Sequence, residues 1–236
     1  MVEAVEEQTP RWGLGDAALG VLVGWVGLLI AASIAAGGSQ SNQTSLTVLA
    51  VGEVGLWVGL VGVMVWASRT KGSGGLRQDF GLEMHRVDVG LGIPVGLVSQ
   101  LLLVPLLYLP IQWIIGRHDL SAPAKDIIGK AHSDGGLALL AVVLIVGAPV
   151  VEELFFRGLV LRSLQRRFAR TAHGDAWAIA ASALIFGFAH LEPLQFPALA
   201  MFGAILGYLA VRTGRLGPGI WAHAAFNALA VAFLAR

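Results

Sequence analysis

The chain has 236 residues, of which 56% are apolar and only 13% are charged, and its mean hydropathy is +0.74. Soluble domains contain about 25% charged and about 45–50% apolar residues, so this composition predicts an integral membrane protein. The absence of cysteine excludes disulfides, thiolate catalysis and zinc–thiolate sites. The net charge of +1 and the scattered basic residues give no indication of a nucleic-acid partner.

Apolar stretches of about 20 residues predict membrane-spanning helices, and the chain contains about seven of them, within a range of about six to eight. They are Leu14–Ala36, Leu46–Ala67, Val89–Ile115, Leu137–Leu161, Ala176–His190, Leu194–Val211 and Gly217–Leu234. The expected fold class is therefore all-α, a polytopic transmembrane helical bundle. Its expected surroundings are the lipid bilayer.

Proline and glycine add detail to this pattern. The third span is expected to be long and tilted, or broken near Pro94 or Pro105. Pro149 has no N–H, which leaves the carbonyl of Ile145 without its usual helical partner and predicts a kink in the fourth span. That span is expected to continue as a basic helix through Phe168. Three glycine pairs predict close helix packing: Gly20 with Gly24, Gly55 with Gly59, and Gly203 with Gly207.

The charges of the loops predict the orientation, because Lys and Arg concentrate on the cytoplasmic side. Basic residues gather in the second, fourth and sixth loops: Arg69, Lys71, Arg77, Arg86, Arg162, Arg166, Arg167, Arg170, Arg212 and Arg215. The first loop, Gly37–Ser45, has no charge. We expect a multi-pass protein of the cell (plasma) membrane with a cytoplasmic amino terminus and an external carboxyl terminus.

Two adjacent acids, Glu152 and Glu153, follow the apolar run Leu137–Val151 in the fourth span. An ionisable group inside a membrane costs about 2.5–3.5 kcal/mol on insertion scales, so it is a functional-site hypothesis by default. Glu153 and Arg157 are spaced i,i+4 and can form an ion pair on one helix face. Glu152 points about 100° away from that face and is left free of this ion pair.

Two later spans contribute polar side chains with the same spacing. Phe186 and His190 share a face of the fifth span, and His223 and Asn227 share a face of the seventh. Taken alone, each histidine is more typical of a satisfied interior side chain or of a contact between helices. Together with Glu152, they predict one shared cavity, because buried polar groups need partners.

Such a cavity suits hydrolysis of a peptide bond in two ways. In the first, Glu152 takes a proton from water, His190 orients the water, and His223 and Asn227 donate to the oxyanion. In the second, His190, His223 and Glu152 hold a zinc ion with one open position. Both remain open from the residues alone.

The motif set Glu-Glu-xxx-Arg (Glu152, Glu153, Arg157), Phe-xxx-His (Phe186, His190) and His-xxx-Asn (His223, Asn227) resembles that of the CPBP family. This family includes the type II CAAX prenyl endopeptidases and the bacterial Abi and lysostaphin-resistance-like proteins. The resemblance covers about the last 100 residues and implies an intramembrane endopeptidase, of metallo or glutamate type, with Glu152 as its acid/base. It divides the chain into amino-terminal helices and loops, 1–136, and a CPBP/Abi-like catalytic core, 137–236.

The expected function is hydrolysis of peptide bonds in membrane-associated or CAAX-like substrates, so the expected partner is a peptide or protein in or near the membrane. The first alternative is a non-catalytic immunity or scaffold protein of the same fold. The second is a proton-coupled transporter, for which intramembrane Glu and His would act as relay groups. The lack of an inverted repeat argues against transport.

Overall fold

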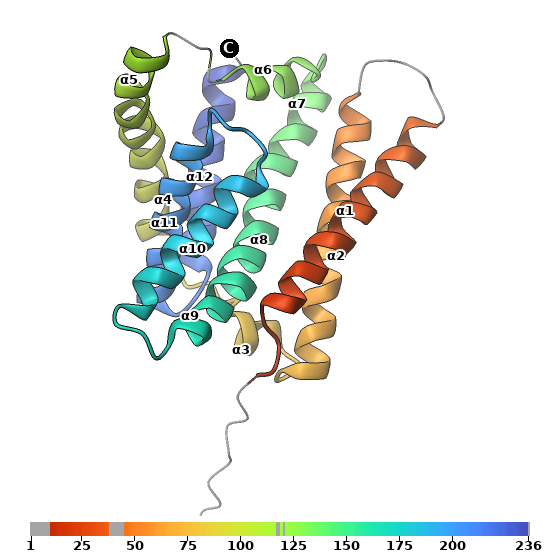
Figure 1. Cartoon of the computed structure of the whole chain (residues 1–236). Coiled ribbons are helices and arrows are strands. Elements are labelled where there is room, and N and C mark those ends of the chain that lie inside the picture. The colour runs from red at the N-terminus through yellow and green to blue at the C-terminus, as the bar shows by residue number, and fades with distance from the viewer. Residues whose placement is uncertain (1–9, 38–44, 117–118, 120, 236) are drawn as a thin grey trace, which may run out of the picture.

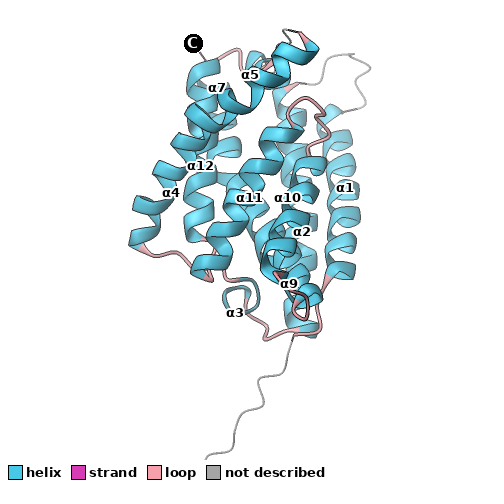
Figure 2. Cartoon of the chain, turned by 60° about the vertical axis from the view of Figure 1, so that its left-hand side comes forward, coloured by secondary structure: helices cyan, strands magenta, loops and turns pink. Residues whose placement is uncertain are grey.

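The computed structural model describes residues 10–37, 45–116, 119 and 121–235, and all regular structure in these residues is helical (Figure 2). The α-helices are α1 (Leu14–Ala36), α2 (Leu46–Lys71), α3 (Leu76–Phe80), α4 (Arg86–Val98), α5 (Val104–Ile115), α6 (Ala122–Gly129), α7 (Asp134–Ala141), α8 (Ala148–Glu152), α9 (Arg162–Phe168), α10 (Gly174–Ala189), α11 (Phe196–Thr213) and α12 (Gly217–Leu234). Three π-helical segments join some of them: η1 (Ser99–Leu103), η2 (Val142–Gly147) and η3 (Glu153–Leu161). The all-α prediction is confirmed.

Six helices in the described residues are long and apolar enough to cross a membrane. They are Leu14–Ala36, Leu46–Lys71, Arg86–Ile114, Asp134–Phe168, Phe196–Thr213 and Gly217–Leu234. The remaining predicted span, the fifth (Ala176–His190), corresponds to α10, which is shorter, with 16 residues, and ends at Ala189, one residue before His190. The polytopic helical bundle is thus confirmed, with one short member.

The first two helices form an antiparallel hairpin at one side of the bundle (Figure 1). Glycines bring the two backbones together, since a Cβ atom at Gly27 would collide with the carbonyl of Gly55, and one at Gly59 would collide with the backbone of Gly24. Gly55 and Gly59 are one of the predicted glycine pairs. In lipid the surrounding tails are as apolar as the side chains, so the hydrophobic effect does not bring helices together. Helices associate there by close packing of their backbones at small residues.

The prolines in the third and fourth spans do not end these helices. The third span runs as helix from Arg86 to Ile115, through Pro94 and with a π-helical turn before Pro105. Of the two predicted alternatives, the long span without a break is the one that occurs. The fourth runs from Asp134 to Phe168, as predicted, and η2 precedes Pro149. A π-helical turn changes which carbonyl each N–H meets, so the chain accommodates proline without ending the helix.

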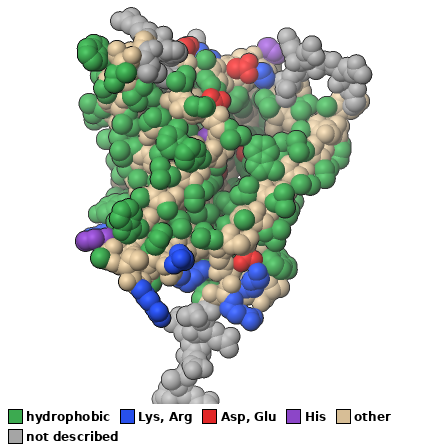
Figure 3. Space-filling view, viewed as in Figure 1, with side chains coloured by type: hydrophobic (Ala, Val, Ile, Leu, Met, Phe, Trp, Pro, Cys, Tyr) green, Lys and Arg blue, Asp and Glu red, His purple; other side chains and the backbone are tan. Residues whose placement is uncertain are grey.

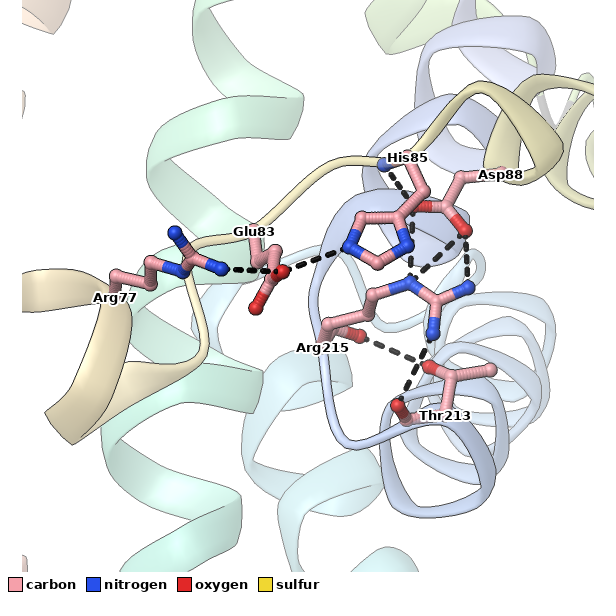
Figure 4. Close-up of polar contacts among 6 residues, drawn as sticks. All are labelled: Arg77, Glu83, His85, Asp88, Thr213 and Arg215. Carbon is pink, nitrogen blue, oxygen red and sulfur yellow. Dashed lines mark hydrogen bonds and ion pairs between the residues drawn. The ribbon is translucent and has the colours of Figure 1, made fainter.

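Charge divides the two ends of the bundle. Figure 3 shows Lys and Arg at the end where α1 begins, below a largely apolar belt, and Figure 1 shows the described start of the chain and the end of α12 at opposite ends of the bundle. Figure 4 shows two neighbouring ion-pair groups at the basic end: Arg77 and His85 contact Glu83, and Arg215 contacts Asp88. Hydrogen bonds from His85 and Arg77 lower the pKa of Glu83, which keeps this linker charged.

Candidate active site

Glu152, His190 and His223 come together at the middle of the bundle. The Oε2 atom of Glu152, at the end of α8, lies 3.9 Å from Nε2 of His190 and 3.9 Å from Nε2 of His223. His190 follows the last residue of α10, and His223 lies in the second turn of α12. Three of the four side chains predicted to share a cavity therefore lie close together in the structure.

The other nitrogen of each imidazole is occupied by an acceptor. Nδ1 of His190 lies 2.8 Å from the carbonyl of Phe186, and Nδ1 of His223 lies 3.2 Å from Oε1 of Glu153. A carbonyl only accepts, and a carboxylate paired with arginine also accepts, so we assign the proton to Nδ1 in both neutral rings. Each Nε2 then carries a lone pair near Glu152, whose own Oε2 is buried without a hydrogen-bond partner. Three hydrogen-bond acceptors therefore lie close together, Oε2 of Glu152 and Nε2 of His190 and His223, and a bound molecule that donates hydrogen bonds would satisfy them.

The predicted ion pair of Glu153 and Arg157 forms at full burial. Nη1 of Arg157 donates to Oε1 of Glu153 over 2.9 Å, and Nη2 donates to the carbonyl of Gly203 on α11 over 3.0 Å. Glu153 is 0% exposed and Arg157 1%. Nδ1 of His223 contacts the same Glu153 oxygen that accepts from Arg157. The ion pair therefore fixes the orientation of the imidazole through the ring nitrogen that faces away from Glu152.

Aromatic packing completes this support. The buried ring of Phe186 lies edge-on to both imidazoles. Its centroid is 4.7 Å from that of the His190 ring and 5.9 Å from that of the His223 ring. The guanidinium of Arg157 stacks over the same ring at 4.4 Å, a cation–π contact. Phe186 therefore touches both imidazoles and the ion pair, which explains the Phe-xxx-His spacing in structural terms.

Asn227 is placed differently from the prediction. Its Nδ2 donates a 2.8 Å hydrogen bond to the carbonyl of Leu144 in η2, and no contact given by the described residues joins it to Glu152 or to the imidazoles. The side chain ties α12 to the helix that carries Glu152. Its predicted part as an oxyanion donor thus gains no geometric support.

A cavity of about 370 Å³ opens onto the Glu152 and His190 side chains. Its other wall is the α1–α2 hairpin, and Figure 3 shows the hollow between the hairpin side and the rest of the bundle. Apolar residues form most of the lining: Val21, Trp25, Leu28, Leu56, Trp57, Leu60, Phe155, Phe156, Ala189 and Leu191. The site is therefore an apolar pocket with a few polar groups, which is typical of ligand sites.

Sequence reasoning missed one polar residue of this cavity, Glu53 on α2. Its Oε1 accepts a 2.9 Å hydrogen bond from Nε1 of Trp57. The signal was available, since Glu53 is an ionisable residue inside the apolar run Leu46–Ala67. The residue belongs to none of the three motifs, which are all later in the chain.

The residue types at the centre suit zinc, and their side chains lie slightly further apart than the ligands of a zinc ion do. Two ligands of a tetrahedral zinc ion with bonds of about 2.0–2.1 Å lie about 3.3–3.4 Å apart, whereas Glu152 lies 3.9 Å from each imidazole nitrogen. Among the described residues, no group of three His, Asp or Glu side chains is arranged to hold a metal ion. The mechanism proposed below uses none.

The fold and this site define a class, a polytopic helical membrane protein with a carboxylate–imidazole site inside the bundle. Comparison with known proteins then adds the family: residues 134–229 match the family of type II CAAX prenyl endopeptidase Rce1-like proteins. The resemblance predicted from the three motifs is confirmed over this segment, which holds all six predicted site residues, and the family is one of membrane proteases. No curated protein and no solved structure matches the chain.

Proposed function

We propose that the chain is an intramembrane endopeptidase in which Glu152 activates a water molecule for attack on a peptide bond of a membrane-associated substrate, CAAX-like tails being one such class. The observation that carries the proposal is the buried, unpartnered Oε2 of Glu152, set 3.9 Å from two imidazole nitrogens. A buried water molecule takes two to four polar partners, and these three groups supply them.

The reaction uses residues that the site already holds. Glu152 accepts a proton from the water as the water oxygen bonds to the scissile carbonyl carbon, with His190 orienting the water from Nε2. His223, when doubly protonated, donates from Nε2 to the oxyanion. Glu152 then returns its proton to the leaving nitrogen as the C–N bond breaks. The products are a carboxylic acid and an amine, and Glu152 is regenerated.

In this scheme Glu153 and Arg157 are positioning residues, because they act through the imidazole of His223. Asn227 positions the helix of Glu152 through Leu144. The proposed setting is the cell (plasma) membrane, with the basic end of the bundle and the amino terminus in the cytoplasm, following the concentration of Lys and Arg on that side. The metal-removal experiment below distinguishes this reaction from a zinc-dependent variant.

The decisive test compares the wild type with Glu152→Gln after reconstitution in lipid vesicles with a library of apolar peptides. The amide keeps the shape of the side chain but has no basic carboxylate, so we expect normal folding and a rate about 10²–10⁴-fold lower. Asp126→Asn, which removes an exposed acid of α6, is the matched control and should cleave like the wild type.

Two results would count against catalysis. One is equal cleavage by the wild type and Glu152→Gln. The other is equal rescue, by both proteins, of a cellular phenotype caused by deletion of the gene, which would favour the immunity or scaffold alternative.

A further inference from the structure

The cavity in front of Glu152 contains a second acid, and that acid comes from a part of the chain outside the Rce1-like segment. Glu53 lies on α2, in the hairpin that forms the far wall, whereas Glu152 and His190 lie on the other wall. A group held between the two walls therefore meets the reacting carboxylate on one side and Glu53 on the other.

Trp57 holds Glu53 in place, because it contacts both Glu53 and the helix that precedes Glu152. Trp57, one turn further along α2, donates its indole N–H to Oε1 of Glu53. The same indole ring fills the space beside Gly147, where a Cβ atom would collide with it. Gly147 closes η2, directly before the helix α8 that carries Glu152. Trp57 thus positions the Glu53 carboxylate relative to the candidate active site.

The charge of this cavity is one-sided. Its titratable lining residues are Glu53, Glu152 and His190, and no Lys or Arg lines it. No ion pair in the described part of the chain involves Glu53, and the single neutral donor of Trp57 leaves its other oxygen to the cavity. Carboxylates in apolar surroundings are costly unless a cation or several donors compensate them.

We propose that Glu53 is a specificity-determining residue of the proposed endopeptidase, and that it selects apolar peptides with a Lys or Arg side chain near the scissile bond. The inference rests on the proposed function. A substrate cation in this position pairs with Glu53 in a partly desolvated site, while an acidic side chain meets two carboxylates. The preferred substrate class is accordingly an apolar segment that carries a basic side chain.

The test uses one apolar peptide in three versions, with Lys, Gln or Glu at a single position next to the scissile bond. Their dissociation constants are measured by fluorescence anisotropy on Glu152→Gln in nanodiscs, so that binding is read without turnover. We expect the Lys peptide to bind at least about tenfold more tightly than the Glu peptide, the scale of one partly buried charge pair.

Variants of Glu53 then test whether this residue causes the preference for the Lys peptide over the Glu peptide. Adding Glu53→Gln should bring the ratio of the two dissociation constants close to one, and adding Glu53→Lys should reverse it. Asp126→Asn in the same background, which removes an exposed acid, should leave the ratio unchanged. In the protein that retains Glu152, Glu53→Gln should raise KM for the Lys peptide with little change in kcat, because a binding residue acts on the ground state as well.

The two hypotheses fail separately. Equal binding of the three peptides, or a Lys preference that survives Glu53→Gln, overturns the role of Glu53 even if the peptides are cleaved. Conversely, a charge preference that depends on Glu53, together with cleavage that does not depend on Glu152, keeps the specificity inference and overturns the proposed catalysis.

Discussion

The side-chain amide of Asn227 donates a 2.8 Å hydrogen bond to the backbone carbonyl of Leu144. The N–H of Ala148 reaches the carbonyl of Val143, which is the π-helical spacing of five residues. In the same spacing Leu144 would meet the N–H of residue 149, and that residue is proline, which has none. Asn227 therefore supplies the donor that Pro149 lacks. The sequence had predicted Ile145 as the unpaired carbonyl, because it assumed α-helical spacing.

This relationship gives a first prediction. Asn227→Ala should destabilise the protein by about 1–3 kcal/mol, the cost of leaving a buried carbonyl unpaired. Pro149→Ala provides a backbone N–H at the right place, so Asn227→Ala should cost less in that background. A double-mutant cycle on unfolding free energies in detergent measures the coupling. Equal costs in the two backgrounds would show that Asn227 acts elsewhere.

A second prediction concerns the buried ion pair. Arg157→Ala leaves Glu153 charged and buried, with only His223 beside it, and should destabilise the fold by about 3–5 kcal/mol. Arg157→Lys keeps the charge but not the fork that reaches Glu153 and Gly203 together, so its loss should be smaller. Denaturant unfolding of both variants is the measurement. A fully stable, fully active Arg157→Ala protein would contradict the positioning role.

Metal removal gives a third prediction. In the proposed mechanism the carboxylate of Glu152 activates the water without a metal ion. Dialysis against a strong zinc chelator should leave peptide cleavage unchanged, and elemental analysis of the purified protein should give much less than one zinc per chain. Loss of activity that zinc alone restores, with His190→Ala and His223→Ala both lacking the metal, would favour the metallopeptidase mechanism.

The linker between α2 and α4 gives a fourth prediction, on pH. Burial disfavours the charged form of Asp79 on α3, but hydrogen bonds from Ser68 and Ser73 outweigh burial and lower the pKa of this carboxyl. Since the folded-state pKa lies below the unfolded value of about 3.9, the ionised Asp79 stabilises the fold above about pH 4. This contribution is lost as the pH falls through the lower folded-state pKa.

Unfolding temperatures between pH 7 and pH 3 check the effect as a difference between the wild type and Asp79→Asn, which removes the titration. The gap should be constant at neutral pH and should narrow in acid. A gap that stays constant down to pH 3 would rule out Asp79 as a source of the acid sensitivity.

Much of the architecture could be read from the chain itself. The length of the apolar stretches alone predicted the spans. Lipid offers no hydrogen-bond partners, so a segment that crosses it must pair its backbone N–H and C=O groups internally, as a helix does. The i,i+4 spacing of Glu153 and Arg157 predicted their ion pair, which needs only helix geometry. The motifs on three spans predicted that Glu152, His190 and His223 meet, since unpartnered polar groups in a membrane are costly.

Only the tertiary structure decided which partners the remaining polar groups take. Asn227 turned to Leu144 because π-helical spacing moved the unpaired carbonyl by one residue, a change that local sequence did not reveal. Glu53 joined the cavity because Gly27 and Gly55 let α1 and α2 pack as a hairpin, while Trp57 seats against Gly147 on the helix of Glu152. Spacing along one helix follows from its fixed geometry, whereas contacts between helices depend on how the surfaces of both partners fit.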